Sequence, residues 1–166
     1  MMKDTVEMFE TAVEIKFSES VMINRPIGDV FDYVSEMQNL PKYDHVVRAS
    51  EKTTEGPIGV GTEFQLQNQL GVLRGHLTMT FLEFDSPHRF LFHNTRFGPI
   101  AETAEFLFEE LDDSTRVTIQ GETHPVGPLR LIGPVFNRSA TRLRNRILAS
   151  LKQELEAPIL KRSRQR

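Results

Sequence analysis

The chain has 166 residues, of which 39% are hydrophobic and 26% charged, and it contains no cysteine. These values are typical of one folded domain, and they exclude a disordered chain, disulfide bonds and thiolate metal sites. The N-terminus is acidic without an apolar core, and no apolar run approaches the ~20 residues that span a bilayer. We therefore expect a cytoplasmic protein without a secretory signal or a membrane helix.

The charge is unevenly distributed along the chain. The net charge is −3, but residues 130–166 carry ten Lys/Arg and two Asp/Glu, whereas the rest carries ten Lys/Arg and 21 Asp/Glu. One interpretation is a basic helix that lies over an acidic sheet. The other is an anionic partner, such as weak contact with an anionic membrane or an acidic ligand. Nucleic acid is not expected as a partner, because the rest of the surface would repel phosphate. The sequence does not indicate an oligomeric state.

The first elements follow from changes in periodicity. Residues 1–12 form a loose N-terminal segment, and Val13–Val21 alternates apolar and polar residues as a half-buried strand does. Pro26 suits the start of a helix, and Asp29 favours its positive end. Apolar residues then recur at helical spacing up to Asn39-Leu40-Pro41. The pattern predicts two short helices after the first strand.

Strands without intervening helices are predicted next. Their ranges are 46–54, 62–70, 73–84, 88–95, 100–111 and 115–123, separated by turn-forming Gly, Pro, Asp and Ser residues. Such a series predicts an antiparallel meander.

The last element is predicted to be a long amphipathic helix, which Gly127-Pro128 precedes and which Pro134 either starts or kinks. Its apolar stripe consists of Phe136, Ala140, Leu143, Ile147, Leu151 and Leu155. A helix from Pro134 to Glu156 would be about 35 Å long, which matches a ten-residue strand of about 33 Å. One helix can therefore lie across the whole sheet, and residues 158–166 follow it as a basic tail.

These elements predict an α+β fold, with a curved antiparallel sheet of about seven strands wrapped on a long C-terminal helix. One helix cannot easily fill the concave side of such a sheet. Either large side chains or a ligand must fill the remaining volume, and the sequence leaves both possibilities open.

Several segments, in this order and spacing, resemble the polyketide cyclase/dehydrase and lipid-transport family, which belongs to the START-like or birch-pollen-allergen-like superfamily (SRPBCC). The matching segments are Arg25–Ser35, Asn39–Asp44, Gly59–Thr62, Ser86–Phe90 and Asp113–Thr118. The resemblance implies a helix-grip fold, with a START-like ligand-binding domain over residues 13–157. It gives little guidance on function, because the family includes lipid carriers, hormone receptors and aromatase/cyclases. Tyr43 is a departure, because such sequences usually carry Trp there.

Strand alternation gives a candidate cavity face, and the helix stripe gives the facing wall. The candidates are Phe64, Leu66, Leu77, Met79, Phe81, Phe90, Phe92, Phe106, Phe108, Leu143, Ile147 and Leu151. The alternative interpretation is that all of them form an ordinary core.

Arg144 is the candidate polar anchor of the cavity. At 100° per residue it falls between Leu151 and Leu155, whereas Arg138, Arg142 and Arg146 point to solvent. Its guanidinium either meets a ligand carboxylate, phosphate or enolate, or reaches past the helix edge to a surface carboxylate. Further possible anchors are Asn68, Asn94, Glu102 and Asn137.

The other polar residues give no catalytic signature. The histidines are scattered, with His76 and His93 in the outward register of their strands, and no three ligands converge as a metal site requires. We therefore expect neither a metal nor a cofactor, and no Ser-His-Asp arrangement can be argued.

Three functions remain open. The leading hypothesis is that the protein carries or senses a small apolar or amphipathic ligand without catalysis. The second is a metal-free cyclase or dehydratase-like acid/base enzyme that uses Arg144 and a carboxylate such as Glu102. The third is an interaction module that docks its basic helix on an anionic membrane or protein.

Overall fold

The structure is a computed structural model and describes residues 15–97, 100–125 and 133–157. The predicted loose N-terminal segment, Gly127-Pro128 and the predicted basic tail lie outside these ranges. The order of elements is β1 (Ile15–Ile23), α1 (Ile27–Ser35), the 3₁₀ helix η2 (Met37–Asn39), α2 (Leu40–Tyr43), β2 (Val47–Lys52), β3 (Glu63–Leu70), β4 (Leu73–Asp85), β5 (Arg89–Phe97), β6 (Ile100–Leu111), β7 (Ser114–Pro125) and α3 (Gly133–Glu156).

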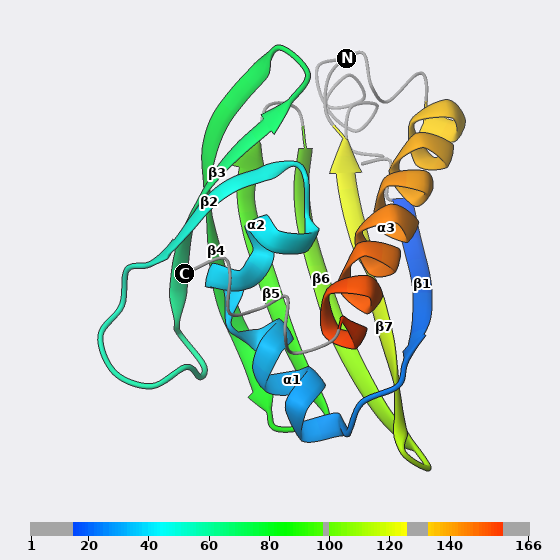
Figure 1. Cartoon of the computed structure of the whole chain (residues 1–166). Coiled ribbons are helices and arrows are strands. Elements are labelled where there is room, and N and C mark those ends of the chain that lie inside the picture. Colours follow the sequence, from blue (N-terminus) through cyan, green and yellow to red (C-terminus); the bar gives the residue numbers. More distant parts are fainter. Residues whose placement is uncertain (1–14, 98–99, 126–132, 158–166) are drawn as a thin grey trace, which may run out of the picture.

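The described strands form one curved antiparallel sheet in the order β1-β7-β6-β5-β4-β3-β2 (Figure 1). Strands β2 to β7 form the predicted meander, and β1 closes the far side by pairing with β7. Two-residue turns join β3 to β4 and β6 to β7, where Gly71 (φ 61°) and Asp112 (φ 53°) take left-handed conformations that Gly and Asp tolerate. The structure confirms the predicted α+β helix-grip fold.

Helix α1 begins after Pro26 and buries one face. Val30, Phe31 and Val34 on that face are buried, as their helical spacing predicted, and Asp29 lies in the first turn. The ring of Phe31 packs edge-on against Phe108, with centroids 5.1 Å apart. Helix α1 therefore covers one end of the inner face of the sheet.

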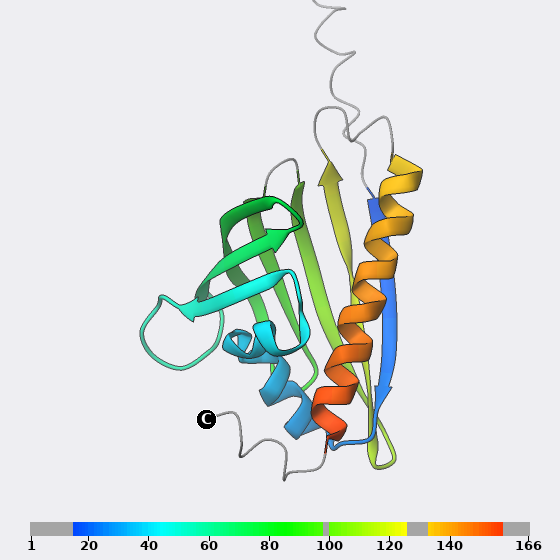
Figure 2. The ribbon, with the colours of Figure 1, turned by 45° about the horizontal axis from the view of Figure 1, so that its top comes forward.

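Helix α3 does not cover the middle of the sheet. Among the described elements it packs mainly against β1 and more weakly against α2, and it runs beside β1 in both views of the ribbon (Figures 1 and 2). Arg25 and Tyr33 hold its C-terminal end, donating hydrogen bonds to the Leu155 carbonyl at 3.0 Å and to Glu154 at 3.2 Å. The inner face of the central strands is therefore left partly without helical cover.

The buried side of α3 is rotated from the predicted apolar stripe. Arg144, Leu148, Leu151 and Leu155 are buried on α3, whereas Leu143 and Ile147 are only partly buried. The prediction omitted Leu148 because it assumed a helix over the sheet centre, whereas α3 turns this side toward β1. The Phe136 side chain lies outside the described part.

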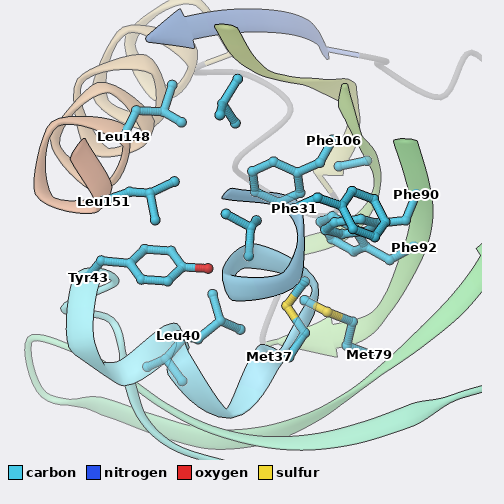
Figure 3. Packing of buried hydrophobic residues seen from close by; sticks show 14 of the residues in the cluster. Phe31, Met37, Leu40, Tyr43, Met79, Phe90, Phe92, Phe106, Leu148 and Leu151 are labelled. Atoms are coloured by element: carbon cyan, nitrogen blue, oxygen red, sulfur yellow. The ribbon is translucent and has the colours of Figure 1, made fainter. Parts of the chain in front are cut away.

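Part of the concave side is filled by phenylalanine rings. The ring of Phe90 lies 4.9 Å from that of Phe81 and 5.2 Å from that of Phe106, centroid to centroid (Figure 3). Phe31 meets Phe90 edge-on at 6.0 Å, so α1 extends this cluster. At this end of the sheet, large side chains fill the volume.

We predict that Phe90→Ala lowers the free energy of unfolding by about 3–5 kcal/mol, because it leaves a cavity at the centre of the ring cluster. Leu82→Ala is the control, since Leu82 is 46% exposed and should cost no more than about 0.5 kcal/mol. Urea denaturation measures both values. Similar losses in the two variants would contradict the described packing.

Candidate functional site

A hollow of about 660 Å³ lies between α3, the short helices and the inner face of the sheet. Its volume falls within the ~300–1,000 Å³ usual for small-molecule sites. Apolar side chains from both sides form most of the wall, including Leu77, Met79 and Phe92 from the sheet and Leu143 and Ile147 from α3. The hollow occupies the part of the concave side that neither α3 nor the ring cluster fills.

The predicted cavity residues divide into two groups. Those that line the hollow are Leu66, Leu77, Met79, Phe92, Phe106, Leu143, Ile147, Arg144, Asn68, Asn94 and Glu102. Phe64, Phe81, Phe90, Phe108, Leu151 and Asn137 do not line it.

The second group corrects the sequence prediction. Alternation identifies the face of a strand, but it does not say how far along the strand the hollow extends. Phe90 and Phe108 lie where α1 covers the sheet, and Leu151 packs in the core (Figure 3). Asn137 has a buried side-chain oxygen without a hydrogen-bond partner in the described part of the chain, but it lies outside the wall of the hollow.

Sequence reasoning missed residues that reach the hollow from outside the strand pattern. Met37, Leu40, Tyr43 and Asp44 come from the short-helix corner and its exit. Leu40 and Tyr43 belong to one of the segments that carry the family resemblance. That resemblance was the one available signal that these residues lie near the hollow. Their inward position depends on how α2 packs, which periodicity over four residues cannot specify.

A polar row crosses the inner face of three strands. Asn94 on β5 pairs with Glu102 on β6, which pairs with Thr123 on β7. All three line the hollow, and the Thr123 hydroxyl donates to the Glu102 carboxylate at 3.4 Å. The next row toward the ring cluster is Phe92, Ala104 and Gly121, so the sheet side of the hollow has a polar end and an apolar end.

Four buried polar atoms that line the hollow have no hydrogen-bond partner in the described part of the chain. They are the Tyr43 hydroxyl, Asn68 Oδ1, Asn94 Oδ1 and Arg144 Nη2. Buried polar atoms in folded proteins nearly always have partners, so this set is unusual unless water or a ligand completes it. The Tyr43 ring is fully buried and its hydroxyl points into the interior (Figure 3).

Two carboxyl groups also line the hollow. Burial raises the pKa of Glu102, although the nearby Arg144 guanidinium opposes this shift. Burial likewise raises the pKa of Asp44, against hydrogen bonds from the Val46 and Val47 backbone amides. The negative charge of Asp44 raises the pKa of Glu102 further.

Arg144 has a partner that neither sequence interpretation named. Its Nε donates to a carboxylate oxygen of Glu19 on β1 at 2.9 Å, and both side chains are less than 10% exposed. The guanidinium also lies 3.8 Å from the centroid of the Phe17 ring, a cation–π contact. The partner is thus a buried carboxylate on β1, not the surface carboxylate of the second interpretation, and the expected ligand anion stays a prediction.

The other arginines of α3 lie toward solvent as predicted. Arg138, Arg142 and Arg146 are exposed, and the last two also border the solvent edge of the hollow. None of the helices described is both long and apolar enough to cross a membrane. Within residues 15–97, 100–125 and 133–157, no three His, Asp or Glu side chains converge as metal ligands would.

A second, more open depression of about 520 Å³ lies where α1 meets the end of α3. Arg25, Asp29 and Tyr33 are among its lining residues, and Arg25 and Tyr33 already bond to α3. Its walls belong to a structural joint between the two helices, so the hollow between the sheet and α3 is the better candidate site.

A curved seven-stranded antiparallel sheet that grips a C-terminal helix around a hollow defines a START-like protein with the helix-grip fold. The family described as polyketide cyclase/dehydrase and lipid transport matches residues 14–156, and the chain belongs to this family. A search among curated protein sequences gives no match.

Solved structures share the fold at low sequence identity. A START superfamily protein from Mycobacterium smegmatis has a TM-score of 0.72 and 13% identity, with 85% of this chain and 97% of that chain covered. The di-domain ARO/CYC BexL from the BE-7585A biosynthetic pathway has a TM-score of 0.71 and 17% identity, and the match covers 95% of this chain but only 55% of BexL. The Zhui aromatase/cyclase from Streptomyces sp. R1128 has a TM-score of 0.66 and 13% identity, with 87% and 98% covered. At these identities the likeness extends to the fold alone.

We predict that Arg144→Leu lowers the free energy of unfolding by about 3–5 kcal/mol, because it leaves the Glu19 carboxylate buried without a partner. The double variant Glu19→Leu/Arg144→Leu should recover most of this loss, since both charges are then removed. Arg142→Leu, at an exposed position on the same helix, should change stability by no more than about 0.5 kcal/mol. Denaturation curves of the four proteins measure these values, and equal effects at Arg142 and Arg144 would contradict a buried pair.

A second prediction concerns pH. Because the pKa of Glu102 is raised in the folded state, its contribution to stability is present at low pH and is lost as pH rises through that raised pKa. Glu102→Gln should therefore be more stable than the wild type at pH 8, and this advantage should disappear near pH 4. Glu110→Gln, at an exposed position of the same strand, should show no such pH-dependent difference in thermal or urea unfolding.

Proposed function

We propose that this protein binds a small apolar or amphipathic molecule in the hollow between its sheet and α3, as a carrier or a sensor. The observation that supports this most directly is a hollow of about 660 Å³ with a largely apolar wall and four buried polar atoms that lack hydrogen-bond partners in the described structure. An apolar wall favours uptake of an apolar body, and a few fixed polar groups orient it. Family membership supports the proposal, because lipid transport stands in the description of the family.

The direct test is native mass spectrometry of the purified protein, followed by identification of whatever it releases. A bound species of fixed mass would support the proposal. A displacement assay with a fluorescent analogue of a long-chain alcohol would show whether the hollow accepts an apolar chain.

We predict that Ala140→Trp lowers the affinity for that analogue at least tenfold, because Ala140 lines the hollow and an indole there occupies part of its volume. Ala149→Trp is the matched control, since Ala149 lies on the same helix, is exposed and does not line the hollow. Fluorescence titration measures both affinities. Equal binding by the wild type and Ala140→Trp would place the analogue outside the hollow.

The second candidate function is an acid/base enzyme that uses the same hollow. One observation favours it: burial raises the pKa of Glu102, which lines the hollow together with Arg144, and a carboxyl group with a raised pKa suits general acid catalysis. Structures with aromatase/cyclase in their names share the fold, which is compatible with this function. Mass spectrometry separates the two candidates, because a carrier releases its ligand unchanged, whereas an enzyme changes the mass or structure of a supplied ligand and loses this ability in Glu102→Gln.

A further inference from the structure

The buried polar groups of the hollow carry information about the chemistry of its ligand. Counted by charge, the described wall contains two carboxyl groups, Asp44 and Glu102, and three guanidinium groups. Two of the latter, Arg142 and Arg146, are exposed, so water screens them. The third, Arg144, is neutralised by Glu19. The buried part of the wall therefore offers an anion no unpaired positive charge.

A ligand carboxylate inside the hollow would be the third acidic group there. The charge of Asp44 already disfavours the charged form of Glu102, and burial disfavours the charged form of each. Adding another carboxylate to this poorly hydrated volume would add repulsion and a desolvation cost. An uncharged polar group avoids both costs.

The unpartnered atoms of the hollow include acceptors that need a hydrogen-bond donor and a donor that needs an acceptor. Asn68 Oδ1 and Asn94 Oδ1 lack a donor, Arg144 Nη2 lacks an acceptor, and the fully buried Tyr43 hydroxyl can serve as either. A hydroxyl group both donates and accepts, so one alcohol oxygen can satisfy one atom of each kind. A carboxylate only accepts, and it would leave the amide oxygens unsatisfied.

The geometry places these groups where one ligand can meet them. Asn94 and Glu102 are cross-strand neighbours on β5 and β6, and Arg144 is close enough to Glu102 to lower its pKa. Beyond this polar end, Phe92 and Phe106 line the same hollow. The polar head of a ligand would therefore lie near Glu102, with its apolar body against the two rings.

We propose that the hollow selects an uncharged, hydroxyl-bearing amphipathic ligand and discriminates against the corresponding carboxylic acid. This inference rests on the proposed function, because it requires that the hollow be a binding site. It reverses the sequence-based expectation that Arg144 holds a ligand anion.

The experiment compares 1-decanol with decanoate at pH 8, each displacing the fluorescent alcohol analogue from the wild-type chain. We expect decanol to bind at least tenfold more tightly than decanoate. Decanoate that binds as tightly as decanol would overturn the inference while leaving the proposed function intact. If neither compound binds and the analogue binds Ala140→Trp as well as the wild type, the proposed function itself fails.

Variants then test which side chains discriminate between decanol and decanoate. The double variant Asp44→Asn/Glu102→Gln should bind decanoate about tenfold more tightly than the wild type does, because both acidic groups are removed. Its affinity for decanol should change less than threefold. Glu110→Gln is the matched control on β6 and should leave both affinities unchanged. Circular dichroism establishes that each variant folds; if the double variant does not, the single variant Glu102→Gln should show the same direction. No gain for decanoate in a folded variant would overturn the assignment to these carboxyl groups.

Discussion

A single helix is narrower than the sheet it must cover, and the remaining features of the molecule follow from this mismatch. A helix with its side chains is about 10–12 Å across. Seven strands at about 4.8 Å spacing extend over roughly 29 Å. Helix α3 packs mainly against β1, and α1 covers one end of the central strands with the help of the phenylalanine cluster. The hollow is the volume that neither helix fills, although α3 forms part of its wall.

The buried pair of Arg144 and Glu19 belongs to the same arrangement. Placing α3 against β1 turns one long polar side chain of the helix into the interior, where an unpaired guanidinium would be costly. Glu19 removes this cost, and the Phe17 ring adds a favourable contact. Among the described residues, Arg144 is the buried arginine that lines the hollow, and the pair neutralises its charge. Helix position and cavity electrostatics are thus set by the same contact.

The sequence was sufficient for the fold and for the inner face of the sheet. Alternation placed Leu66, Met79 and Phe92 on the inner side, and the structure puts all three in the wall of the hollow. It was insufficient wherever the answer depended on how separate elements meet. Glu19 shares the inward register of Phe17 and Val21, so its burial could be read from the strand, but its partner on α3 could not. Asp44 lines the hollow because of the way α2 packs. The rotation of α3 that buries Leu148 is likewise a property of the helix–strand contact, which no pattern within α3 contains.

The pairing of β1 with β7 has a consequence for how the chain is made. Strands β2 to β7 pair with their neighbours in sequence, so most of the sheet can assemble as each hairpin is synthesised. The contact between Glu19 and Arg144 joins residues 125 positions apart, and it must wait for α3 to leave the ribosome. Until then the part of the inner face beside β1 lacks its covering helix, and exposed apolar strands are the species most prone to aggregate. Helix α3 is therefore the element that completes the wall of the hollow, because Leu143 and Ile147 reach it only after all the strands have been synthesised.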